Sequence, residues 1–156
     1  SMARPLEPDL PNEIRTRAIP SHPGLALLRD IVDTMDADPA VRETARTRML
    51  SIVTNRPVFA TAWTHFVVGR SMLGESGVGR QQRGLVELLH LPALYADDQA
   101  FLTGLALYLA AAGLERLGDP DAARQVRSEL DALYPSHPVR RQPLALPSFE
   151  QAKDTG

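Results

Sequence analysis

One short stretch, Leu117-Gly118-Asp119-Pro120, constrains the fold more than any other, because it joins a helix stop to a helix start. Glycine is favoured just after a helix C-terminus, aspartate caps helix N-termini, and proline is tolerated at the first helical position. An apolar segment, about 98–117, precedes this stretch, and an amphipathic one follows it to about residue 133. The sequence therefore predicts a tight helical hairpin.

The same pattern recurs in weaker form upstream. Asp38-Pro39 repeats the helix start, and Leu73-Gly74-Glu75 repeats Leu117-Gly118-Asp119 at an offset of 44 residues. Alanine and leucine are abundant and β-branched residues are few, which favours helices over strands. Apolar periodicity predicts six helices, at about 24–36, 38–54, 58–73, 80–91 (ending before Pro92), 98–117 and 119–133.

We therefore expect an all-α fold, a short superhelix of about three antiparallel hairpins. A single hairpin cannot bury its apolar face alone, and stacking the hairpins gives a continuous core. We assign residues 24–134 to one helical domain. Prolines are frequent in residues 1–23 and 135–156, which we interpret as an N-terminal arm or linker and a C-terminal tail.

Composition narrows the classes of function. The chain has no cysteine, which excludes disulfides, thiolate metal sites and cysteine nucleophiles, and we expect no cofactor. The net charge of -2 gives no general attraction to nucleic acid or anionic lipid. No apolar run is long enough to cross a bilayer, so we expect no membrane insertion. The absence of cysteine suits the cytoplasm and the periplasm alike, so the compartment stays open. Ser1-Met2 resembles a cloning remnant, and a targeting segment could have been removed before it.

The last hairpin resembles a tetratricopeptide repeat over residues 104–135. Ala111 stands where the two helices of such a repeat cross closely, Gly118-Asp119 at the turn, Ala123 at the small position of the second helix and Pro135 at the end. The resemblance implies a helical repeat that binds a protein or peptide in a groove lined by the first helix of each hairpin. Tyr134-Pro135-Ser136-His137-Pro138 also resembles the close of repeat units in bacterial envelope lipoproteins, which hints at a bacterial, exported protein.

Carried over by position, the resemblance implies a set of groove residues from the third and fifth helices. The family's carboxylate clamp needs Lys, Asn and Arg at set places, and this chain does not supply that combination, which argues against a chaperone-tail ligand. Tyr108 is the natural aromatic anchor of the groove. The implied residues are Thr61, Thr64, His65 and Val68, and then Leu105, Tyr108, Ala112, Glu115 and Arg116.

Few residues suggest catalysis, and we expect a non-enzymatic interaction or scaffold module. No two of the four histidines are three or four residues apart, and none lies in a known metal motif. His65 is interpreted as a partly buried ring with a hydrogen bond, and His137 as solvated in the tail. Asp30, Asp33 and Asp36 are interpreted as a solvated acidic face, paired with arginines of the second helix.

Two alternatives stay open. One is a small all-α enzyme or ligand-binding domain with a polar pocket around His65, Arg70 and Glu115. The other is a homo-oligomer that assembles through the apolar fifth helix.

Overall fold

The computed structural model describes residues 23–149, and all the regular secondary structure in this part of the chain is helical. It contains no strand, and the consecutive helices between residues 58 and 133 pack against one another, which confirms the predicted all-α arrangement of helical hairpins. The helices are α2 (Pro23–Asp33), α3 (Pro39–Ser51), α4 (Val58–Leu73), α5 (Val78–Leu94), α6 (Ala100–Arg116) and α7 (Pro120–Leu133), with 3-10 helices η1 (Val53–Asn55) and η2 (Pro138–Arg140).

The chain divides into two compact units, with the division between Met49 and Leu50. In the first unit, Asp30 and Asp33 are only 4% and 6% exposed, so the interpretation of a solvated acidic face is wrong for them. The pairing with arginine is confirmed for Asp30, whose Oδ1 lies 2.9 Å from Nε of Arg48. Burial of a carboxylate requires such a partner, because an unpaired buried charge is costly.

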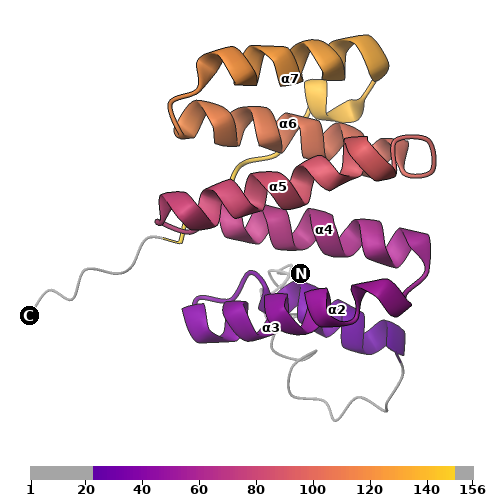
Figure 1. Ribbon diagram of the computed structural model, residues 1–156, viewed down its shortest axis with the longest axis vertical. Coiled ribbons are helices and arrows are strands. Elements are labelled where there is room, and N and C mark those ends of the chain that lie inside the picture. The colour runs from indigo at the N-terminus through magenta and orange to yellow at the C-terminus, as the bar shows by residue number, and fades with distance from the viewer. Residues whose placement is uncertain (1–22, 150–156) are drawn as a thin grey trace, which may run out of the picture. The chain divides into compact units, whose positions relative to one another are not determined.

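The second unit consists of η1, α4 to α7 and η2. Figure 1 shows α4, α5, α6 and α7 side by side in chain order, each running back along its predecessor. Its core is rich in leucine and alanine, and α4 and α6 contribute most of it, including the fully buried Leu107 and Leu109 of α6. None of the helices described, over residues 23–149, combines bilayer-spanning length with sufficient hydrophobicity.

The turn between α6 and α7 has the geometry that its sequence predicts. Gly118 has φ of 82°, a left-handed conformation that favours glycine. The amide of Asp119 donates to the Leu114 carbonyl at 2.9 Å, and the amide of Gly118 donates to the Glu115 carbonyl at 3.0 Å. These two bonds form a Schellman motif. The Asp119 carboxylate then accepts a hydrogen bond from the Ala122 amide at 3.0 Å and caps α7.

The predicted end of the fourth helix is wrong. We expected it to stop before Pro92, but α5 continues to Leu94 with Pro92 inside it. Proline removes one backbone hydrogen bond and does not forbid the next. The Tyr95 amide bonds to the Leu91 carbonyl at 2.9 Å. Leu88 and Leu91 are fully buried, and their packing fixes the helix up to the residue before the proline.

Residues 135–149 fold back onto the second unit. His137, which we expected to be solvated, is only 8% exposed. Its Nε2 donates to the Phe101 carbonyl at 2.9 Å, and its Nδ1 accepts from the Val139 amide at 3.1 Å. The prolines that suggested a free tail prevent helix formation, but they do not prevent packing.

Candidate functional site

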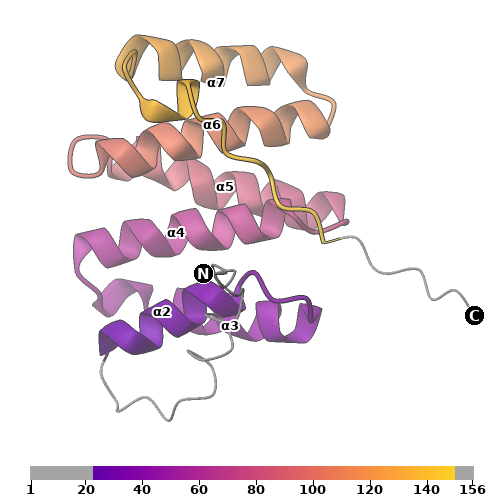
Figure 2. The same ribbon diagram turned by 180° about the vertical axis from the view of Figure 1, so that it is seen from behind.

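The face of α6 that we predicted as a groove carries an extended segment of the same chain. Figure 2 shows the C-terminal segment (residues 141–149) leaving η2, crossing α6 and ending beside the turn between α4 and α5. We use "α6 face" below for the predicted groove positions of this helix. They are Leu105, Tyr108, Ala112, Glu115 and Arg116.

The first anchor of the C-terminal segment is apolar. Leu107, Leu130 and Val139 form a buried cluster, and both Tyr108 and Leu144 pack against it while remaining partly exposed. Tyr108 of the α6 face and Leu144 of the segment therefore share one hydrophobic cluster.

The second anchor is the guanidinium of Arg116. Its Nη1 donates to the Leu73 carbonyl at 2.9 Å and to the Pro147 carbonyl at 3.5 Å. The first bond ties α6 to the end of α4, and the second ties α6 to the C-terminal segment. Because both acceptors are backbone oxygens, this anchor does not depend on the side chain at position 147.

The third anchor is Phe149. Its amide donates to the Gly74 carbonyl at 3.0 Å, and its ring lies where a side chain at position 74 would project. A Cβ atom built on Gly74 would come within 2.6 Å of that ring. Beside this contact is a shallow pocket of about 330 Å³, lined by Gly74, Glu75, Ser76, Gln81, Arg116, Ser148 and Phe149.

The two threonines of the predicted groove donate hydrogen bonds to backbone carbonyls of the second unit. Thr64 is fully buried, and its hydroxyl donates to the Ala60 carbonyl at 2.9 Å. Thr61 is partly buried, and its hydroxyl donates to the Val53 carbonyl at 3.1 Å. Both hydroxyl protons therefore already have acceptors inside the second unit.

Glu115 lies at the exposed end of the α6 face and pairs with Arg127 of α7. A side-chain hydrogen bond from Arg127, with its positive charge, lowers the pKa of Glu115 below its ordinary value. The same bond raises the pKa of Arg127. This pairing links α6 to α7.

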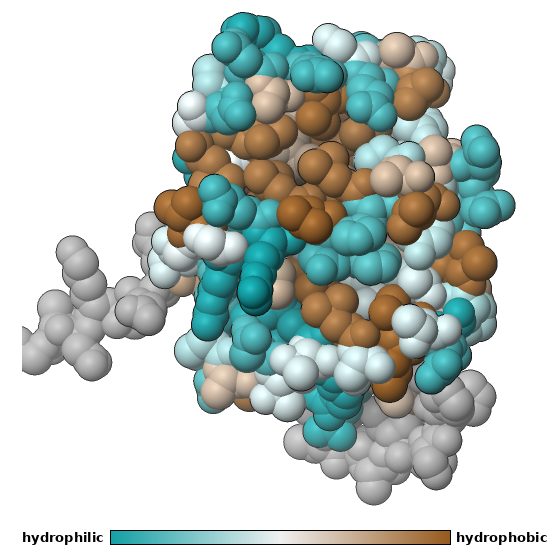
Figure 3. Space-filling model, in the orientation of Figure 1, coloured by the Kyte–Doolittle hydropathy of each residue, from teal (hydrophilic) through white to brown (hydrophobic). Residues whose placement is uncertain are grey.

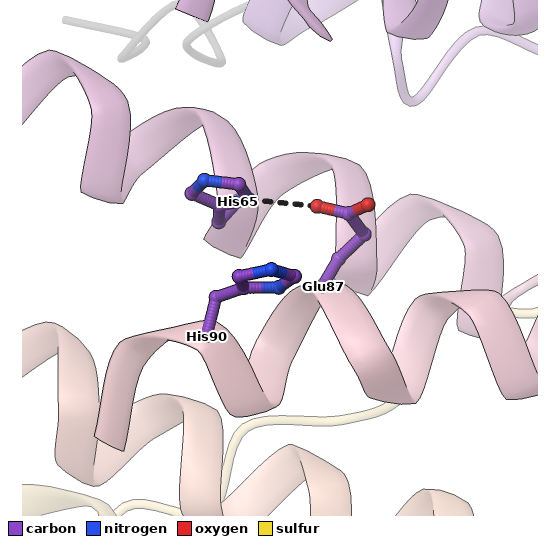
Figure 4. Close-up of side chains that lie close together, drawn as sticks. All are labelled: His65, Glu87 and His90. Carbon is purple, nitrogen blue, oxygen red and sulfur yellow. Dashed lines mark hydrogen bonds and ion pairs between the residues drawn. The ribbon is translucent and has the colours of Figure 1, made fainter. Parts of the chain in front are cut away.

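The three residues of the alternative polar pocket have different surroundings. His65 bonds to Glu87 of α5, with 2.7 Å between Nδ1 and Oε2 (Figure 4), whereas Glu115 bonds to Arg127. Burial lowers the pKa of the Arg70 guanidinium, and its buried Nε has no hydrogen-bond partner among residues 23–149. No interaction found within this range joins the three into one pocket.

Hydrophobic surface is also present on the other side of the second unit. Figure 3 shows hydrophobic side chains gathered over α5 and α6 in that view. The exposed large hydrophobic residues of these two helices are Val78, Val86, Leu89, Leu94 and Phe101. A surface of this kind is available to a partner, but no contact within residues 23–149 indicates which one.

Two features of this unit are absent from the predictions made from the sequence. Leu144, Pro147 and Phe149 fall in the predicted tail, although alternating apolar residues among prolines indicate an extended packed segment. The second feature is the spacing of three between Glu87 and His90 on a predicted helix, which a comparison of the histidines with one another does not reveal. The approach of His65 to both is a tertiary contact without a local signal.

Comparisons with models of known protein families, with curated proteins and with solved structures gave no match.

Proposed function

We propose that this protein is a non-enzymatic interaction module that binds an extended, proline-containing segment of a partner protein along the α6 face. The observation that carries this proposal is the chain's own C-terminal segment, which lies on that face through Leu144 and Pro147 and contacts Gly74, at the end of α4, through Phe149. The resemblance of residues 104–135 to a tetratricopeptide repeat supports the same function. The partner segment would present an aliphatic residue, a proline and an aromatic residue at the same spacing.

The chemistry of the face suits such a ligand. The Arg116 guanidinium and the Gly74 carbonyl bond to backbone atoms of the segment, so they would accept many sequences. The cluster around Tyr108 and the space above Gly74 each accept an apolar side chain, which would give selectivity. Prolines limit the conformations of the free ligand and so reduce the entropy lost on binding.

The chain's own segment competes with any partner. A short tether gives an attached segment an effective concentration of roughly millimolar. To displace the segment, a partner must have a higher ratio of concentration to Kd than the attached segment has. Otherwise the segment would first have to be released. We infer that the C-terminal segment holds the α6 face closed until a stronger ligand is present.

The test uses a fluorescein-labelled peptide with the sequence of residues 141–150 and measures its anisotropy with the full-length chain. The wild-type protein should bind this peptide poorly, because its own segment occupies the face. A Leu144→Ser/Phe149→Ala double variant, which weakens the attached segment and keeps the face intact, should bind the peptide at least about tenfold more tightly.

Two controls make the test specific. A scrambled peptide should not bind the double variant, and adding Tyr108→Ala to it should weaken binding of the native peptide. Circular dichroism verifies that each variant is helical. A folded double variant that binds neither peptide, or binds both equally, would refute the proposed site. Peptide-independent dimers in light scattering would instead favour exchange of the segment between two copies.

A further inference from the structure

Three side chains with metal-binding atoms converge on the α4–α5 hairpin, away from the α6 face. Figure 4 shows His65 reaching from α4 toward Glu87 and His90, which project from α5. One potential ligand atom from each residue lies within 4.8 Å of the others. Among residues 23–149 this is the one group of three such side chains.

The helices bring these residues together for simple geometric reasons. Glu87 and His90 are three apart on α5, and residues at that spacing share a helix face. His65 lies one turn before Gly69, where α4 approaches Gly84 of α5 closely. On antiparallel helices, a residue one turn before the crossing faces a residue one turn after it, which is Glu87.

The ring of His90 is oriented for binding. Its Nδ1 lies 2.8 Å from the Val86 carbonyl oxygen, which can only accept a hydrogen bond. Nδ1 therefore carries the proton, and Nε2 keeps its lone pair. Metal-binding histidines commonly donate their second N–H to a backbone carbonyl in this way.

The other surroundings complete a small, partly shielded site. The ring centroids of His65 and His90 are 4.5 Å apart with an interplanar angle of 11°, so one of these stacked rings must turn before the in-plane lone pairs of both can point at one ion. The centroid of the Tyr95 ring lies 6.1 Å from that of His65. The side chains of His65 and Glu87 are 11% and 18% exposed, so both are mostly shielded from solvent but still accessible to an ion. The bond of 2.7 Å between His65 Nδ1 and Glu87 Oε2 holds a proton where a cation could replace it.

We propose that His65, Glu87 and His90 bind one divalent transition-metal ion, with Zn²⁺ as the preferred ion. Two imidazoles and one carboxylate suit zinc and similar first-row metals, whereas Ca²⁺ and Mg²⁺ prefer sites made of oxygen ligands. Tetrahedral zinc needs ligand atoms about 3.3 Å apart, which follows from bond lengths of about 2.0–2.1 Å. The separations between ligand atoms, which extend to 4.8 Å, must shrink by up to about 1.5 Å, and rotation of the side chains, including one of the stacked rings, would have to supply this change.

Three protein ligands leave at least one coordination position open. Water would fill that position, or a carboxylate or imidazole side chain of another protein could do so. The site therefore either stabilises the α4–α5 hairpin or bridges it to a partner. This inference is independent of the proposed peptide site, because it uses different residues on different helices.

The test is isothermal titration of the untagged, EDTA-treated full-length chain with ZnCl₂. We expect one ion per chain, with His65→Ala and His90→Ala each weakening binding by at least the 10–100-fold typical of losing a supporting residue. Glu87→Gln keeps the side-chain volume and should also weaken binding. Two matched exposed substitutions, Gln82→Ala on α5 and Glu129→Gln on α7, should leave the affinity unchanged.

Two further measurements separate binding at this site from adventitious binding. Excess Zn²⁺ should raise the Tm of the wild type by several degrees and leave that of His90→Ala unchanged, because an ion that binds only the folded state stabilises it. Co²⁺ should give visible absorption bands in the wild type alone. Equal zinc affinity in wild type and His90→Ala, or no binding by the wild type, would overturn the proposal. His65 and Glu87 would then form an interhelical ion pair only.

Discussion

Gly69 of α4 and Gly84 of α5 face each other so closely that a Cβ atom built on either would lie 2.8 Å from the other's carbonyl oxygen. The contact is reciprocal, and its obstacles are backbone atoms that cannot rotate away. It sets the distance between the two helices, and through that distance it places His65 opposite Glu87.

Substitution of either glycine should therefore loosen the α4–α5 hairpin. We expect Gly69→Ala and Gly84→Ala each to lower the free energy of unfolding by about 1–3 kcal/mol, the usual cost of overpacking. Urea denaturation followed by circular dichroism measures this change. Gly79→Ala is the control, since no atom lies within 4 Å of its added Cβ, and it should be neutral or stabilising. Equal effects at positions 69 and 79 would contradict the close approach.

Gly104 has a comparable relation to His137. A Cβ atom at position 104 would lie 2.4 Å from Cδ2 of the histidine ring. Gly104→Ala should cost about 1–3 kcal/mol of stability by displacing the ring from its bonds to Phe101 and Val139. In a double-mutant cycle, Gly104→Ala should cost much less when His137 is already alanine. Additive losses would show that the two residues do not interact.

The left-handed conformation of Gly118 makes a different prediction, because nothing lies within 4 Å of a Cβ at this position. The penalty of Gly118→Ala is therefore conformational and should be about 1–2 kcal/mol. Gly118→Asn should lose less stability, since asparagine tolerates this conformation better. Thermal unfolding of both variants tests the order, and an alanine variant as stable as wild type would be inconsistent with the Schellman motif.

The C-terminal segment can be released by filling the space above Gly74. Gly74→Ala should push the Phe149 ring away and break the bond from its amide to the Gly74 carbonyl. Hydrogen exchange of the Phe149 amide should then accelerate by at least about tenfold, while the amides of α7 keep their protection. Unchanged exchange at position 149 would mean that the segment is held mainly elsewhere.

The Glu115–Arg127 pair predicts a local effect of pH. The bond lowers the pKa of Glu115 in the folded state, so its contribution is present above the unfolded value of about 4.3. It is lost as the pH falls through the lower folded value. Arg127→Gln should move the Glu115 pKa back up toward the unfolded value, as measured by carbon NMR of the side-chain carboxyl. Because the pair is exposed, we expect little change in overall stability.

Much of the fold is local and could be predicted from sequence. The end of α6 and the start of α7 follow from the residue types at Gly118 and Asp119, because the conformational and capping preferences of these residues act within one turn of helix. The apolar periodicity that located α4, α6 and α7 is likewise a property of each segment alone. Pro92 shows the limit of this reasoning, because α5 is anchored by the buried Leu88 and Leu91 just before the proline and continues through it.

The candidate sites depended on contacts between segments that are distant in sequence. His65 of α4 and His90 of α5 are distant in sequence. Their rings stack because the close backbone contact between Gly69 and Gly84 brings the two helices together. The prolines around His137 suggest a solvated side chain, but its ring is buried because Gly104, which has no side chain, leaves space for it. The sequence by itself determined the helices and the turn at Gly118, since helix propensity and capping act over a few residues. Only the tertiary structure decided which side chains meet, since that depends on how closely two backbones can approach.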